Sequence, residues 1–306
     1  MYYQLMINEM LLLLGVDITK ITFVNGMDFQ MKPEYNFDVY RINSLITVGG
    51  AKHAGAQVVK ASENPSMASL LYPTLQALDE VHLQVDAQFG GIDQRKIFTL
   101  AREYLCKLDK NPFNSELKYN KRIHLMNEMV PGIRVVKIPE KIIASEENNN
   151  NIAIDTSSAN VLINDNEEKE GEKSDDEDIN MKMSASNEKT KIDLLETPKN
   201  IKKKINASYC LEGDIDDNSI LVILEKVIFR ILENTGQQFV VERKEEFGGN
   251  VSFENIEQVR KAFVDLELHP GDLKSGISSF LTTFLEPIRL KFSSKEMIAL
   301  INKSYK

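Results

Sequence analysis

Cysteine and histidine are scarce in this chain of 306 residues, which has two cysteines and four histidines. Cys106 and Cys210 form neither a CxxC pair nor a disulfide framework, which favours reduced core thiols over a single long-range disulfide. The histidines, at positions 53, 82, 124 and 269, lack the spacing of metal ligands, so no metal site is expected. We expect His82 and His124 to be structural, and a reducing, cytoplasmic compartment is the default.

Long apolar runs are also missing. No stretch reaches the length of a membrane span, so no membrane partner is expected. The run at residues 10–14 is too short for a signal peptide, follows Glu9 instead of a basic region, and precedes no small-residue cleavage site. With 42% hydrophobic residues, the chain can form one large or two moderate globular domains.

The net charge of −9 is distributed unevenly. Residues 145–180 contain twelve Asp or Glu against two Lys, so this segment carries −10 and leaves +1 for the rest, which is compatible with binding nucleic acid. Residues 134–180 contain no aromatic residue but four consecutive asparagines, a composition typical of disorder. This insertion can be a regulatory or docking segment, or it can be a tolerated low-complexity expansion, which we favour. A second, smaller expansion covers residues 109–120.

Strand-like and helical segments alternate over the first 130 residues, which predicts a parallel α/β sheet. The strands are expected at residues 20–24, 85–89 and 122–126, and the helices at 2–14, 39–48, 51–60, around Tyr72, and at 92–107. Beyond residue 189 the pattern is mostly helical, with helices expected at 198–205, 219–233, 256–268 and 276–291.

The helix around Tyr72 places three polar side chains on one face. Tyr72, Gln76 and Asp79 follow one another at i, i+4 and i+7, which stacks them in one stripe and turns the leucines between them toward a core. The next strand ends at Gly90 and Gly91, where the backbone can approach a ligand before another helix begins. The stripe alone would indicate a polar seam on a buried helix, but with this turn it indicates a binding site.

Four motifs, in this order, resemble those of cytosolic tyrosyl-tRNA synthetases of the eukaryotic and archaeal type, which are class I enzymes. The motifs are YxxxQxxD at 72–79, VDAQFGGIDQRKI at 85–97, HLMNEMVPG at 124–132 and KMSAS at 182–186. The resemblance implies an incomplete Rossmann-type parallel sheet in a catalytic domain at 1–133 and an all-α anticodon-binding domain at 197–306. Between them lie the insertion at 134–180 and the KMSAS loop with a linker at 181–196.

The resemblance also implies a reaction. The carboxylate of tyrosine attacks the α-phosphate of ATP, which gives tyrosyl-adenylate and pyrophosphate, and the tyrosyl group then passes to the 3′ end of tRNA(Tyr). No protein nucleophile is required, so catalysis rests on positioning and on stabilising phosphate charge. The implied partners are L-tyrosine, ATP with Mg2+, tRNA(Tyr) and a second copy of the chain in a homodimer; no DNA partner is expected.

The stripe on the Tyr72 helix would bind the amino acid. By resemblance, Asp79 accepts a hydrogen bond from the phenol hydroxyl, while Tyr72, Gln76 and Gln94 hold the α-amino group. Phenylalanine would leave the Asp79 carboxylate unpaired, which is the known basis of discrimination in a tyrosyl-tRNA synthetase.

ATP is expected to contact two parts of the chain. Gln88 and the backbone of Gly90 and Gly91 would line the floor beside tyrosine and the ribose. The second part is the loop formed by Lys182, Met183, Ser184, Ala185 and Ser186. One lysine and two hydroxyls can cradle pyrophosphate, and the resemblance assigns this catalytic role to Lys182, Ser184 and Ser186. Ala185 replaces a lysine of the consensus, which does not by itself imply inactivity.

Two residues of the helical region resemble anticodon-reading elements. Phe247, in the sequence FGGN, would stack on the first anticodon base, and Asp272, in HPGDLK, would hydrogen-bond to its Watson–Crick edge. Taken alone, each is equally compatible with a structural role, as a core phenylalanine or as a turn residue.

Three functions follow from these observations. The first is a tyrosine-tRNA ligase; because the sequence has no counterpart of the family's HIGH-like motif, we expect the polypeptide as given to be catalytically impaired. The second is a non-catalytic, tRNA-binding or dimerising paralogue, against which the retained binding residues argue. The third is the related tryptophanyl enzyme, which shares KMSAS-type loops; Asp79 and the Asp-Gln-Arg-Lys turn at 93–96 favour tyrosine.

Overall fold

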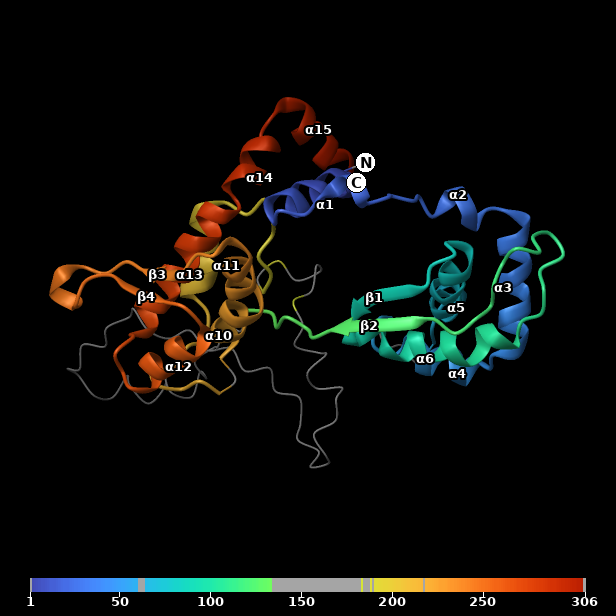
Figure 1. Ribbon diagram of the computed structural model, residues 1–306, viewed down its shortest axis with the longest axis horizontal. Helices are drawn as coiled ribbons and strands as arrows, with labels where there is room; N and C mark the ends of the chain where they lie inside the picture. Colours follow the sequence, from blue (N-terminus) through green and yellow to red (C-terminus); the bar gives the residue numbers. More distant parts are fainter. Residues whose placement is uncertain are drawn as a thin grey trace, which may run out of the picture. The chain divides into compact units, whose positions relative to one another are not determined.

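The computed structural model describes residues 2–59, 64–133, 183, 188, 190–216 and 218–304, which form two compact units (Figure 1). The sheet unit comprises Thr22–Met129, and the C-terminal unit combines the described residues of Met1–Ile21 with those that follow Met129. The insertion at 134–180 and the loop residues Lys182, Ser184, Ala185 and Ser186 lie outside the described residues. The expectations for them, and the domain boundaries drawn from the sequence, stay predictions.

The sheet unit contains two parallel strands, β1 (Ala87–Gly91) and β2 (Ile123–Asn127), which confirms the predicted parallel pairing (Figure 1). Parallel neighbours need a crossover connection. Helix α6 (Arg95–Tyr104) supplies it, flanked by the 3-10 turns η2 (Ile92–Gln94) and η3 (Leu105–Lys107). Both strands leave apolar side chains exposed, although parallel sheets are normally covered on both faces.

Residues 20–24 do not form the predicted strand. The 3-10 turn η1 (Ile18–Lys20) covers the first of them, and the others have no regular structure. A strand is stable only where a neighbour takes up its backbone hydrogen bonds, and in the described part of the chain β1 pairs with β2 alone within this unit. The β-branched residues at 20–24 were therefore not sufficient to form a strand without a neighbouring strand.

Helix α5 (Met67–His82) is central to the sheet unit, because it contacts three other helices. These are α3 (Pro33–Leu45), α4 (Val48–Gly55) and α6, while the short α2 (Met27–Gln30) precedes α3. Ser66 caps α5 by accepting a hydrogen bond from the backbone N–H of Ser69. The helix buries Ala77, Leu78 and Val81 completely and leaves its polar stripe partly exposed, as its periodicity predicts.

The C-terminal unit is built mainly from helices around a second core, in which α13 lies against α9. Helix α1 contacts α14 and α15, and the ring of Tyr2 meets that of Phe292 edge-on at 6.0 Å. Residues 2–13 thus belong to this compact unit. Its helices are α1 (Tyr2–Leu13), α9 (Pro198–Asn206), α10 (Ser219–Ile223), α11 (Arg230–Thr235), α12 (Ile256–Val264), α13 (Pro270–Phe284), α14 (Glu286–Lys291) and α15 (Lys295–Ser304).

Among the described residues, no helix is long and apolar enough to span a membrane.

An antiparallel strand pair corrects the prediction that this region is entirely helical. β3 (Phe239–Val241) and β4 (Val251–Phe253) are joined by a loop that contains the 3-10 turn η5 (Glu245–Phe247). The pair approaches α13 so closely that a Cβ on Gly276 would lie 3.0 Å from the Phe239 ring. Strands of three residues are too short to show an alternating pattern in the sequence.

A π-helical turn, Leu224–Phe229, joins α10 to α11. Ile220, Leu224, Ile228 and Leu232 recur every four residues and are all buried. In a regular α-helix, four residues turn the chain by roughly 40° more than one full turn, so side chains at this spacing move progressively around the helix. The wider π turn winds less per residue and takes up part of the drift, so the four side chains stay in the core.

Candidate functional site

Two side chains from the preceding helices hold Asp79 on the polar face of α5. Its Oδ1 accepts a hydrogen bond from Nε2 of Gln30 at 2.9 Å and one from the Tyr35 hydroxyl at 2.8 Å. Among the described residues, no donor reaches the other oxygen, Oδ2. The carboxylate is therefore fixed through one oxygen and keeps a free acceptor on the other. No motif in the sequence marks Gln30 or Tyr35.

Tyr35 is a firmly placed donor. Its side chain is buried, and its ring packs edge-on against Phe29 at 5.7 Å and in a tilted arrangement against His82 at 4.7 Å. Burial, together with the nearby charge of Asp79, raises the pKa of Tyr35 far above its usual value. The hydroxyl therefore remains protonated and can donate to Asp79 at any physiological pH.

Gln76 and Gln94, predicted to bind the same part of the ligand, meet in the structure. Nε2 of Gln76, on α5, donates to Oε1 of Gln94, at the start of α6, over 3.0 Å. Tyr72 lies one turn earlier on α5, and its side chain is 46% exposed. The structure thus brings the two glutamines together and leaves Tyr72 free to face a ligand, but their assigned roles stay predictions.

The last two residues of β1, Gly90 and Gly91, are glycines that have no room for a side chain; the strand includes them, whereas the sequence predicted a turn there. A Cβ on Gly90 would lie 3.0 Å from the Phe98 ring, and one on Gly91 would lie 2.6 Å from Oδ1 of Asp93. Two residues before Gly90 on the same strand, Oε1 of Gln88 is buried and has no hydrogen-bond partner in the described part of the chain. An unsatisfied buried acceptor costs about 1–3 kcal/mol, so we expect a ligand group or a water molecule to supply the donor.

Two of the three histidines of the sheet unit, His82 and His124, bind buried carboxylates, in keeping with the structural roles predicted for them. Nε2 of His124, on β2, lies 2.8 Å from Oε1 of Glu80, and its ring stacks on Phe98 at 4.4 Å. Burial raises the pKa of Glu80, although the hydrogen bond from His124 opposes this. In the described ranges, no three His, Cys, Asp or Glu side chains gather as they would around a metal ion.

Asp38, on α3, is the centre of a buried network. Its carboxylate accepts hydrogen bonds from Nη1 of Arg41 at 3.0 Å and from the hydroxyl of Tyr119, and it lies 3.1 Å from Nε2 of His82. Burial alone would raise the pKa of Asp38, but the hydrogen bonds from His82 and Tyr119 outweigh it and leave the pKa lowered. The network fixes α3 to α5 and to the expansion at 109–120.

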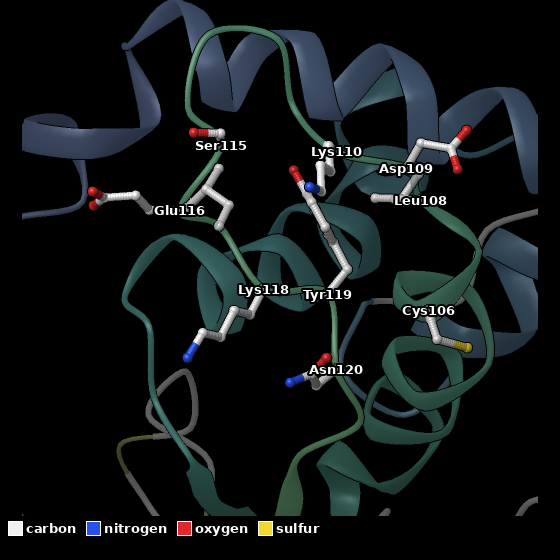
Figure 2. A pocket seen from close by; sticks show the side chains of 10 residues that line it. Cys106, Leu108, Asp109, Lys110, Ser115, Glu116, Lys118, Tyr119 and Asn120 are labelled. Atoms are coloured by element: carbon white, nitrogen blue, oxygen red, sulfur yellow. The ribbon is translucent and has the colours of Figure 1, made fainter.

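A hollow of about 700 Å³ borders this expansion (Figure 2). Cys106, Lys110 and Tyr119 are among its lining residues, and none of the residues predicted to bind tyrosine or ATP takes part. The hollow is therefore separate from the candidate site. Cys106 is exposed, so the prediction of a core thiol is wrong for it, whereas Cys210 is partly buried.

Phe247 is not a core phenylalanine, because its side chain is 63% exposed on η5. Two glycines with positive φ, Gly248 and Gly249, turn the chain directly after it. Such backbone suits glycine and holds the ring on a tight surface loop. The exposure favours the stacking role over the structural one.

Arg243 connects the Phe247 loop to the start of α13, which carries Asp272. Its Nε donates to the Gly249 carbonyl and its Nη1 to the Glu267 carbonyl, each over 3.0 Å. Glu267 precedes the His269 cap of α13, and Asp272 is in the first turn of that helix. The sequence analysis missed Arg243, since a side chain that binds two carbonyls leaves no motif.

Comparison with known proteins identifies the family. A family model described as "tRNA synthetases class I (W and Y)" matches residues 1–164 and 175–286. "Tyrosine--tRNA ligase, cytoplasmic" of Xenopus tropicalis is 40% identical over 304 residues, which are 99% of this chain and 47% of that protein. The protein of the same name from Saccharomyces cerevisiae is 37% identical over 309 residues, 99% of this chain and 65% of that protein.

A similar solved structure is that of tyrosyl-tRNA synthetase from Pyrococcus horikoshii complexed with L-tyrosine. It has a TM-score of 0.71 and 25% identity, and the match covers 92% of this chain and 68% of that one. The chain spans about half the length of the Xenopus relative. Because the family model matches well over half of its residues, the chain belongs to the class I tRNA synthetases of the W and Y type.

Proposed function

We propose that the chain serves as a tyrosine-tRNA ligase, which activates L-tyrosine with ATP and transfers it to tRNA(Tyr) in the cytoplasm. One observation carries the choice of amino acid: Asp79 is fixed through Oδ1 and keeps Oδ2 free. A fixed carboxylate acceptor suits a phenol hydroxyl and leaves an unpaired charge when phenylalanine is bound instead. The names of the relatives support the same substrate.

In this proposal the described residues bind and orient the amino acid. The phenol hydroxyl donates to Asp79, and the α-amino group lies beside Tyr72 and the linked pair of Gln76 and Gln94. The substrate carboxylate is then positioned to attack ATP, so proximity supplies much of the rate. A donor from the ligand would also satisfy the buried Oε1 of Gln88.

ATP would lie beside the backbone of Gly90 and Gly91 at the end of β1, as the resemblance implies. Lys182, Ser184 and Ser186 would hold the departing pyrophosphate, with Mg2+ entering together with ATP. We also propose a homodimer, which the resemblance implies. No protein group is required to form a covalent intermediate.

Pyrophosphate exchange tests the proposed function. We expect ATP–pyrophosphate exchange by the 306-residue chain to require L-tyrosine, because the fixed carboxylate of Asp79 accepts from the phenol hydroxyl. L-tryptophan serves as the comparison substrate. Exchange driven by tryptophan would contradict the choice of amino acid. Binding of tRNA(Tyr) without any binding of L-tyrosine would favour the non-catalytic paralogue.

Replacement of Phe247 by alanine should weaken tRNA(Tyr) binding without changing stability. Stacking of one base on an aromatic ring contributes about 1–3 kcal/mol, and the exposed ring contributes little to the core. Filter binding of tRNA(Tyr) and thermal unfolding measure the two effects. Val240→Ala is a control, since this residue is also exposed and lies on β3 of the same hairpin. Equal tRNA affinities of the Phe247→Ala variant and the wild type would remove Phe247 from the proposed interface.

A further inference from the structure

We propose that Gln30 and Tyr35 are positioning residues that set the preference for tyrosine over phenylalanine by holding Asp79 in one orientation. The inference rests on the proposed function, because it assumes that Oδ2 of Asp79 receives the phenol hydroxyl. Neither residue need touch the substrate. Each acts through the carboxylate that it binds.

The two donors approach the same oxygen from two different helices. Gln30 is the last residue of α2 and Tyr35 lies in the first turns of α3, so the pair clamps Oδ1 from both elements. The turn between these helices is itself tied, because Nδ2 of Asn36 donates to the backbone carbonyls of Gln30 at 3.2 Å and of Lys32 at 2.9 Å. The clamp therefore has a fixed base.

The Tyr35 hydroxyl lies against the helix that carries Asp79, 2.9 Å from the backbone carbonyl of Leu75, one turn before Asp79 on α5. The phenol has one proton, and its donation to Oδ1 of Asp79, at 2.8 Å, is the one that positions the carboxylate. With its ring buried between Phe29 and His82, the hydroxyl has little freedom to move. A donor anchored in this way fixes both the distance and the direction of the carboxylate.

Occupation of Oδ1 decides which oxygen the ligand can use. With two donors on Oδ1, Oδ2 keeps its lone pairs for the ligand; the hydroxyl of tyrosine can donate to them, whereas the ring of phenylalanine cannot. Without the clamp, the carboxylate can rotate and water can satisfy it equally well. Loss of the clamp should then weaken the binding of tyrosine but not that of phenylalanine, which makes no hydrogen bond there.

Calorimetric titration of the full 306-residue chain with L-tyrosine and with L-phenylalanine tests this inference. The variants are Tyr35→Phe and Gln30→Met, which remove the donors and nearly keep the shapes. The control is Tyr40→Phe, on the same helix, because Tyr40 is 79% exposed. We expect each clamp variant to lower the affinity for tyrosine about tenfold, to leave that for phenylalanine unchanged, and to differ in this from the control.

The outcomes separate this inference from the proposed function. A wild-type chain that binds tyrosine no better than phenylalanine would overturn both. A wild-type preference that survives in both clamp variants would overturn the inference alone, and so would an equal loss of affinity for the two amino acids, which indicates a merely structural role. If Tyr35→Phe does not fold, as judged by circular dichroism, the partly exposed Gln30 decides the matter.

Discussion

Replacement of Asp79 by alanine is expected to lower the affinity of the chain for L-tyrosine by about 10- to 150-fold. The variant loses a hydrogen bond between a hydroxyl and a charged acceptor, worth about 1.5–3 kcal/mol, and it leaves the donors of Gln30 and Tyr35 without their acceptor. Equilibrium dialysis with labelled tyrosine measures the effect. Asp28→Ala is the matched control, since Asp28 is an exposed carboxylate on α2, two residues from Gln30.

The affinity for L-phenylalanine gives the sharper result for the same variant. Phenylalanine offers no hydroxyl to Asp79, so its affinity should remain the same or rise when the charge is removed. A folded Asp79→Ala protein that still prefers tyrosine would show that the phenol hydroxyl binds elsewhere. The assignment of Asp79 would then be wrong, whatever the family.

Replacement of Asp38 by alanine should lower the free energy of unfolding by about 3–5 kcal/mol. Breaking a buried charged network from one side leaves the other partners uncompensated, and here Arg41, His82 and Tyr119 all lose the completely buried carboxylate. Urea unfolding followed by circular dichroism measures the change. The control, Asp109→Ala, removes an exposed carboxylate from the expansion bound by the network, and its effect should stay within about 0.5 kcal/mol.

The difference in stability between wild type and Asp38→Ala should also depend on pH in a predictable direction. The folded state lowers the pKa of Asp38 from its ordinary value of 3.8, so its stabilisation is complete above that value and is lost as the pH falls through the folded pKa. The difference in stability between wild type and Asp38→Ala should therefore shrink below about pH 4. A difference that grows with acidification would contradict the network. Glu80, whose pKa is raised, acts in the opposite direction but is present in both proteins.

Local patterns predicted the parts of the site that lie on single elements. The stripe of Tyr72, Gln76 and Asp79 follows from helical periodicity, which needs only neighbouring residues. The resemblance assigned Gln76 and Gln94 to the same group of the substrate, and the structure brings the two side chains together. The parallel pairing of β1 with β2 follows from the helix between them.

Contacts between distant segments could not be predicted in this way. Gln30 and Tyr35 lie 49 and 44 positions from Asp79, and nothing in the sequence around them indicates a shared partner. The strand expected at residues 20–24 failed for a related reason, because its stability depends on a neighbouring strand and not on its own composition. The helical prediction for the C-terminal region likewise passed over the short pair of β3 and β4, which packs on α13.

The π turn at Leu224–Phe229 lets the number of residues in this helix change without rotating its buried face. A π turn is equivalent to an α-helix with one additional residue. Loss of one residue inside this turn would leave both flanking helices in their present packing, whereas loss of one residue from α11 would rotate everything after it by about 100°. The turn is therefore the place where this helix can gain or lose a residue during evolution without exposing Ile228 and Leu232.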